Sequence, residues 1–163
     1  MRRMGSWLGL VVVVAVAAGC RSLPKADDVA TARTHIQTLR FEEPEEGQIE
    51  ARAELVIYNP GEVKTYIDSI EATLYRGEAA LGRVVSDKHF DIPRWDSKAV
   101  WLAFKDISMA QLEAAIGRQL TKAGAEDFEI EGVIVYQVQE GLLRHPFGKY
   151  RIATILGPAG SGM

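Results

Sequence analysis

The fold class is decided by the stretch IEARAELVIY-NPG, residues 49–61. From Ile49 to Ile57 every second residue is apolar, and Glu50, Arg52 and Glu54 stand between them. This period of two is typical of a β-strand with one buried face. Asn59-Pro60-Gly61 then predicts a turn, because proline fixes φ and glycine tolerates a positive φ.

Six further segments on either side of this strand show strand patterns. The segment 128–138 is apolar on both faces in its middle, as expected for a central strand. Turns or loops are expected at 42–46, 76–78, 92–96 and 145–148, where charged residues, glycine and proline interrupt the patterns. The six predicted strands are 34–41, 65–75, 81–89, 100–104, 128–138 and 150–156.

One segment has the period of a helix. Ser108 and Gln111 form a capping box, apolar residues then recur on one face to Leu120, and Gly124 can end the helix. Strands with a single helix predict a mainly all-β fold: a two-sheet antiparallel sandwich of the immunoglobulin or fibronectin-III kind, with about seven strands and one α-helix.

The start of the chain has the layout of an export signal. Arg2 and Arg3 precede the apolar run Trp7–Ala18, and small residues lead to Gly19 and Cys20. As a helix the apolar run would rise only about 18 Å, short of the roughly 30 Å hydrocarbon core, which disfavours a permanent span. A signal peptide over residues 1–19 with cleavage between Gly19 and Cys20 is therefore expected.

Cys20 is the only cysteine in the chain, so no internal disulfide can form. The preceding residues resemble a bacterial lipobox, which predicts lipidation of Cys20 and attachment to a membrane. Arg21 differs from the Asp that resembles an inner-membrane retention signal at this place. The expected location is the cell envelope, at the periplasmic face of the outer membrane if the host is diderm.

Removing 19 of the 163 residues leaves 144, enough for one domain with a sizeable core. Loss of Arg2 and Arg3 lowers the formal net charge from −3 to −5, and an acidic domain without basic runs is a poor binder of nucleic acid. The expected organisation is a tether over 20–32, the β-sandwich domain over 33–157 and a loose tail over 158–163.

Several of these segments, taken in order, resemble the late embryogenesis abundant type 2 (LEA-2) family, also called the water stress and hypersensitive response (WHy) domain. The resemblance covers about residues 50–156. It implies a sandwich of seven strands with one helix, a role in desiccation and stress tolerance, and no known catalytic residues. Bacterial members are often lipoproteins, in agreement with Cys20. The matching pieces are Leu55–Pro60, Ile70–Tyr75, Leu81-Gly82, Ile92-Pro93 and Ser97.

Candidate metal and catalytic residues are few. His35, His89 and His145 lie on three separate segments, without the short ligand spacing of a zinc site. Asp87 and Asp91 could form a carboxylate pair, but they also fit a loop between strands. The acidic run Glu42, Glu43, Glu45 and Glu46 lacks the alternation of a calcium loop and is expected to be solvated. We therefore expect no metal, no cofactor and no enzymatic activity.

Two features could serve recognition. Asn59 and Pro60 could form a recognition loop, although a structural role in the turn is favoured. Trp95, Trp101 and Tyr150 could form an exposed patch for a protein, peptide or lipid, and each fits a core position equally well. The expected function is that of a non-catalytic envelope lipoprotein that protects or binds macromolecules. The alternative is a carrier or assembly factor that binds lipid or protein, which an apolar cavity near Trp95 or Trp101 would favour.

Overall fold

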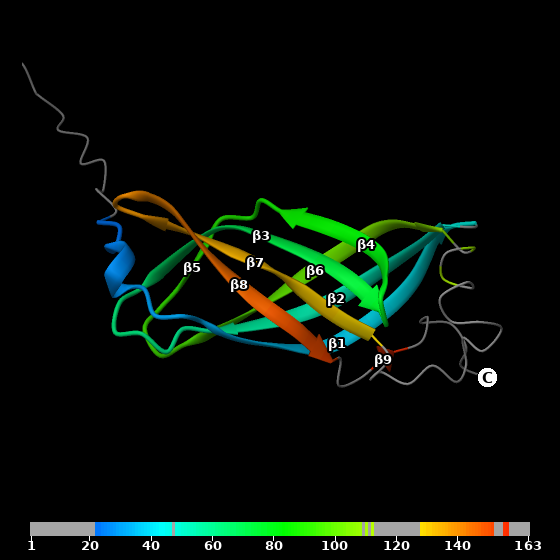
Figure 1. Ribbon diagram of the computed structural model, residues 1–163, viewed down its shortest axis with the longest axis horizontal. Helices are drawn as coiled ribbons and strands as arrows, with labels where there is room; N and C mark the ends of the chain where they lie inside the picture. The colour runs from blue at the N-terminus through cyan, green and yellow to red at the C-terminus, as the bar shows by residue number, and fades with distance from the viewer. Residues whose placement is uncertain are drawn as a thin grey trace, which may run out of the picture.

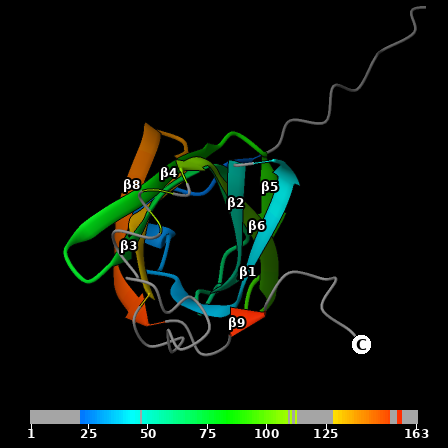
Figure 2. The same cartoon turned by 90° about the vertical axis from the view of Figure 1, so that its right-hand side faces the viewer.

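Two β-sheets lie face to face along the length of the molecule (Figure 1). Their buried apolar side chains form one core between them. The computed structural model describes residues 22–46, 48–108, 110, 112, 128–151 and 155–156. A view along the long axis shows the two sheets as opposite walls of one layered body (Figure 2). The chain is therefore mostly β and forms a sandwich of two sheets, as the alternating patterns predicted.

The strand order in one sheet is β6-β2-β1-β9, and in the other it is β4-β3-β7-β8 with β5 paired to β3. All pairings are antiparallel except that of β1 with β9. The described elements are η1 (Ala26–Asp28), β1 (Arg33–Glu45), β2 (Gln48–Tyr58), β3 (Thr65–Arg76), β4 (Ala79–Ser86), β5 (Phe90–Ile92), β6 (Ser97–Ser108), β7 (Phe128–Val138), β8 (Gly141–Arg151) and β9 (Ile155–Leu156).

Strand β2 is central in its sheet and has the predicted phase. On one face Ile49, Ala51, Ala53, Leu55 and Ile57 are at most 7 % exposed, whereas Arg52 on the other face is exposed. The strand ends at Tyr58, directly before Asn59-Pro60. Because side chains alternate between the two faces of a strand, burial of this one set places β2 against the core without ambiguity.

Strand β7 is central in the second sheet, between β3 and β8. Ile134, Val135 and Tyr136 are consecutive and each is at most 2 % exposed, which confirms burial on both faces in the middle of this strand. Between the sheets, Tyr136, Phe104 and Phe128 are among the largest fully buried side chains. These aromatic side chains fill the space between the two walls.

The turn predicted at 145–148 was wrong. Residues 145–148 lie within β8, where His145 pairs with Ile134 and Pro146 pairs with Val133. Strand β8 is at the edge of its sheet, and an edge strand tolerates a residue without an N–H. The chain turns instead at Gln139-Glu140, before Gly141, whose φ is 129°.

The loop predicted at 42–46 is shorter than expected, because β1 continues through Pro44 to Glu45. Glu42 pairs with Glu50 of β2, and its carboxylate lies 3.4 Å from the Nε of Arg52. The ion pair between Glu42 of β1 and Arg52 of β2 therefore allows part of the acidic run to lie within the sheet.

Several predictions fall largely outside the described residues. These are the signal peptide and Cys20, most of the helix at 108–124, and the tail at 158–163. Of the helix, Ala110 and Leu112 are described; both have helical backbone, and Leu112 is fully buried. Within the described part of the chain, we find no helix that is long and apolar enough to cross a membrane.

Candidate functional site

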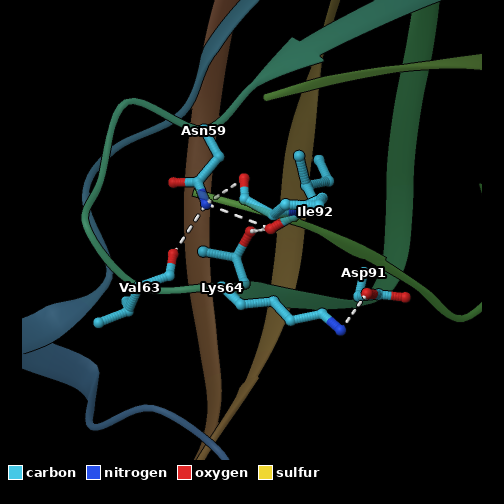
Figure 3. A network of polar contacts seen from close by, with 7 residues as sticks. Asn59, Val63, Lys64, Asp91 and Ile92 are labelled. Atoms are coloured by element: carbon cyan, nitrogen blue, oxygen red, sulfur yellow. Dashed lines mark hydrogen bonds and ion pairs between the residues drawn. The ribbon is translucent and has the colours of Figure 1, made fainter. Parts of the chain in front are cut away.

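The Asn59 side chain connects the loop 61–63 to the Ile92-Pro93 segment at one end of the sandwich (Figure 3). Its Nδ2 donates to the carbonyls of Val63 at 2.9 Å, Ile92 at 3.2 Å and Pro93 at 3.1 Å. Its Oδ1 accepts from the N–H of Gly61 at 3.0 Å. An amide side chain offers donors and an acceptor together, so Asn59 can satisfy carbonyls and an N–H at once.

Asn59 is only 2 % exposed, and all its side-chain polar atoms are bonded within the protein. Gly61 does not have the positive φ that its place in the turn predicted; the described glycines with positive φ are Gly77 and Gly141. A Cβ on Gly61 would lie 3.1 Å from the Cβ of Ala30. Gly61 is thus explained by the close approach of the N-terminal segment, and Asn59 by the bonds that hold the turn.

Residues 23–29, predicted as part of a tether, pack on the domain. The turn between β7 and β8 holds them: Gln139 Nε2 donates to the Leu23 carbonyl at 2.8 Å, and the Gln139 N–H donates to the Pro24 carbonyl at 2.9 Å. The Glu140 carboxylate accepts from the Ala26 N–H at 3.0 Å, and Val29 joins the core at 7 % exposed. This segment therefore leaves the domain at the same end as Asn59.

The three aromatic residues proposed as a contact patch do not lie together. Trp101 is on the outer face of its sheet, opposite Glu54, with the Arg40 guanidinium 5.2 Å from its ring. Tyr150 is on β8 of the other sheet, partly buried, and stacks on Phe147 at 6.1 Å. Trp95 lies in the turn between β5 and β6. The structure thus offers two exposed tryptophans at separate places.

Trp95 occupies an unusual backbone position. Asp96 N–H donates to the Pro93 carbonyl at 3.4 Å, so Arg94 and Trp95 are the central residues of a four-residue turn. The φ of Trp95 is 55°, a left-handed conformation that favours glycine or asparagine in this type of turn. Its side chain is 57 % exposed, and no pattern in the sequence predicted an exposed tryptophan with a left-handed backbone.

The candidate catalytic and metal-binding residues remain apart. His35 is on the outer face of β1, His145 is on β8 facing the interior, and the His89 Nδ1 lies 3.5 Å from an Asp68 carboxylate oxygen. In the described part of the chain, no three His, Cys, Asp or Glu side chains are grouped as metal ligands would be. Asp91 does not pair with Asp87 but with Lys64 at 2.6 Å, and this bond lowers the pKa of the Asp91 carboxyl.

Among the described residues, three buried side-chain polar atoms have no hydrogen-bond partner: Thr34 Oγ1, Tyr136 OH and His145 Nδ1. The Tyr136 and His145 rings meet edge to face at 5.2 Å. Burial raises the pKa of Tyr136 to about 12, and the neighbouring Ala32 backbone opposes this shift. The pattern of β7 predicted that Tyr136 is buried, but no local signal showed that its hydroxyl lacks a strong partner.

The surface of the described residues is hollowed at two of the places that bear on function. One, of about 570 Å³, lies over Gly132 and is lined in part by Glu71 and Arg83. The Glu71 carboxylate is already paired with Arg144 at 2.9 Å and Arg83 at 3.6 Å. The other, of about 510 Å³, lies between the N-terminal segment and the loop 63–66. Neither hollow is lined by Trp95 or Trp101.

No family model matches the sequence, and a search of curated proteins finds no relative. An X-ray structure from the Northeast Structural Genomics Consortium has a similar fold, with a TM-score of 0.50, 10 % identity, and coverage of 77 % of this chain and 88 % of that chain. A solution structure from Arabidopsis thaliana has a TM-score of 0.47 and 14 % identity, covering 88 % of this chain and 89 % of that one. A protein provisionally described as late embryogenesis abundant has a TM-score of 0.40 and 14 % identity, covering 77 % and 73 %. At these identities the likeness concerns the fold alone.

Proposed function

We propose that this chain is a lipid-anchored envelope protein whose LEA-2-like domain acts by surface contact, without catalysis, in the response to water stress. In this proposal Cys20 carries the lipid, and the sandwich is of the fibronectin type, with residues 108–124 as its helix. Arg21 favours the periplasmic face of the outer membrane in a diderm host. The partner is a macromolecule that the domain protects or binds.

The observation that carries the proposal is a filled interior beneath a charged exterior. Phe104, Phe128 and Tyr136 occupy the space between the sheets at 1 % exposure or less. The hollow over Gly132 lies outside this core, and its carboxylate Glu71 is held between two arginines. Large aromatic side chains between the described strands disfavour a carrier whose ligand lies there, whereas a charged outer surface suits contact with other macromolecules.

The place of the Asn-Pro motif also supports the LEA-2 resemblance. In the matching segment Leu55–Pro60, the strand ends and Asn59 joins the loop 61–63 to the Ile92-Pro93 segment. Both Asn59-Pro60 and Ile92-Pro93 belong to the pieces that carry the resemblance. Asn59 bonds directly to the carbonyl of Ile92, which is 33 residues further along the chain. This bond is a structural reason for Asn59-Pro60 and Ile92-Pro93 to occur together in one sequence.

The second candidate, an assembly factor that binds a protein, is favoured by Trp101. This side chain is 40 % exposed on β6, the edge strand of its sheet. Exposed aromatic side chains are enriched in protein interfaces. A Trp101→Ala variant separates this candidate from the first, because a binding hot spot carries more than about 2 kcal/mol whereas a dispersed surface loses little from one residue.

The proposal is tested by complementation of a deletion strain under drying or osmotic stress. His35→Ala, His89→Ala, Asp87→Asn and Asp91→Asn should each keep most of the rescue. Cys20→Ala should lose it, because the lipid determines where the domain acts. Removal of a catalytic acid or base typically costs about 10²–10⁴-fold, which such an assay would detect.

All variants are compared at equal protein levels, with melting curves to show that each is folded. One folded and correctly anchored point variant that abolished rescue would argue for a catalytic or metal site and against the proposal. Loss of rescue in Trp101→Ala alone would favour the assembly factor.

A further inference from the structure

The N-terminal segment fixes how far the domain can be from a lipid on Cys20. Gln139 binds the carbonyls of Leu23 and Pro24, so the chain is held at the β7–β8 turn from Leu23 onward. Only Arg21 and Ser22 stand between Cys20 and Leu23. Three residue steps span at most about 11 Å. A lipid on Cys20 would therefore enter a membrane within about 11 Å of this end of the sandwich (Figure 1).

Trp95 lies at the same end. The N-terminal segment contacts Gly61 through Ala30, and Asn59 bonds both to Gly61 and to the Pro93 carbonyl. The Asn59 N–H also donates to the Asp96 carbonyl at 2.9 Å, so the turn that holds Trp95 is fixed beside the Asn59 loop. These contacts make the turn a rigid part of the end from which the N-terminal segment emerges.

The exposed Trp95 side chain does not account for itself by stabilising the domain. A non-glycine residue held in the left-handed region costs of order 1–3 kcal/mol, and such strain is concentrated at functional sites. Trp95 is 57 % exposed, so burial of its side chain within the domain offsets little of this cost. Glycine would fit the turn without strain. A large aromatic residue at this position therefore points to a contact outside the domain.

We propose that this end of the sandwich rests on the lipid bilayer, with Trp95 inserted at the level of the headgroups. The proposal rests on lipidation of Cys20, which places the bilayer within reach. Tryptophan is enriched at membrane interfaces because its ring is apolar and its N–H can remain bonded to water or headgroups. The Arg94 guanidinium lies 5.2 Å from the Trp95 ring, where it can meet lipid phosphates.

The remaining residues of this end agree with a lipid surface. Leu142, beside the β7–β8 turn, is 63 % exposed. Lys25, Lys64 and Arg94 are outnumbered at this end by Asp27, Asp28, Glu62, Asp96 and Glu140, so net charge is not the source of attraction. The acidic turn after β1 lies at the opposite end of the molecule, away from an anionic membrane (Figure 1).

Tryptophan quenching in vesicles tests the proposal. Trp7 lies in the signal peptide, so Trp101→Phe leaves Trp95 as the single tryptophan of the mature protein, and Trp95→Phe leaves Trp101. Both variants are purified from membranes, their acylation is established by intact mass, and they are placed in vesicles of phosphatidylethanolamine and phosphatidylglycerol. A fraction of the lipid carries bromine near the headgroups.

Emission from Trp95 should be quenched several-fold more than emission from Trp101, because Trp101 lies six residue steps further along the chain, a span of about 20 Å that runs mostly along β6. Equal quenching, stronger quenching of Trp101 or no quenching of either would overturn the orientation while leaving the lipoprotein intact. An unmodified Cys20 thiol in the mass spectrum would instead overturn the proposed function, and the orientation with it.

A stability measurement checks the argument from strain. Trp95→Gly should melt at the temperature of the wild-type protein or above it, because glycine relieves the left-handed backbone. A clearly lower melting temperature would show that Trp95 stabilises the turn itself, which would count against a role in membrane contact.

Discussion

Asn59 shows how one buried side chain can determine the shape of an end of the molecule. The loop 61–63 and the Ile92-Pro93 segment both direct carbonyl groups toward it, and its amide group donates to three of them. Buried carbonyls left without donors would cost about 1–3 kcal/mol each. The Asn59 amide therefore holds the loop 61–63 against the Ile92-Pro93 segment, next to the pairing of Thr65 with Ile92.

Asn59→Asp should destabilise the protein by about 3 kcal/mol or more at neutral pH. The change keeps the shape of the side chain but places a buried carboxylate against carbonyl oxygens and removes both donors. Gln48→Glu, the same chemical change at an exposed position, should stay within about 0.5 kcal/mol. Urea unfolding measures both, and equal effects would show that the Asn59 bonds contribute little.

Tyr136→Phe should change the stability by less than about 1 kcal/mol at neutral pH, because the buried hydroxyl has no strong partner to lose. The pKa of Tyr136 is raised to about 12, above its ordinary value near 10. Its contribution to stability is thus present below about pH 10 and is lost as the pH rises through about 12.

The Phe variant lacks this loss, so it should become the more stable of the two proteins above about pH 10. Unfolding curves at neutral and alkaline pH measure the difference. A variant that is strongly destabilised at neutral pH would reveal an important bond to the Tyr136 hydroxyl.

At the scale of strands, the phase of alternation determines which side chains stabilise the sandwich. Leu55 on β2 and Leu74 on β3 are fully buried between the sheets, and replacing either by Ala should cost about 2–5 kcal/mol. Glu54, beside Leu55 but on the outer face opposite Trp101, should tolerate Gln within about 0.5 kcal/mol. Chemical unfolding measures the loss of stability in each variant. A larger loss in Glu54→Gln than in either leucine variant would contradict the packing.

The sequence predicted strands well where one or both faces are buried. The alternation in 49–58 gave β2, and the apolar middle of 128–138 gave the central strand β7. It failed at β8, where Pro146 and Gly148 indicated a turn but the edge of a sheet accommodates both residues. Turns and edge strands can both contain proline and glycine, so local composition does not distinguish them. The pairing with β7 shows that residues 145–147 belong to a strand.

The end that carries Trp95 could not be predicted from local pattern. The bonds from Gln139 to Leu23 and Pro24 join residues more than 110 positions apart, so no window of the sequence contains them. The left-handed Trp95 contradicts the preference of its turn for glycine. Both features depend on tertiary contacts, and together they form the surface that we propose to meet the membrane.

For the whole molecule, the two ends of the sandwich have different character. One holds the N-terminal segment, Trp95 and Leu142, and the other holds the acidic turn after β1. An anchor at Cys20 would direct the first end toward the membrane and leave the second end and the outer faces of both sheets accessible. A lipid anchor would thus present a large charged surface to other molecules of the envelope.

A lipid on Cys20 is the central proposal, and intact mass spectrometry of the protein extracted from membranes tests it most directly. The predicted result is the mass of residues 20–163 plus acyl chains, and a Cys20→Ala variant should lose both the acylation and the normal cleavage. A soluble mature protein with an unmodified Cys20 thiol would contradict the account.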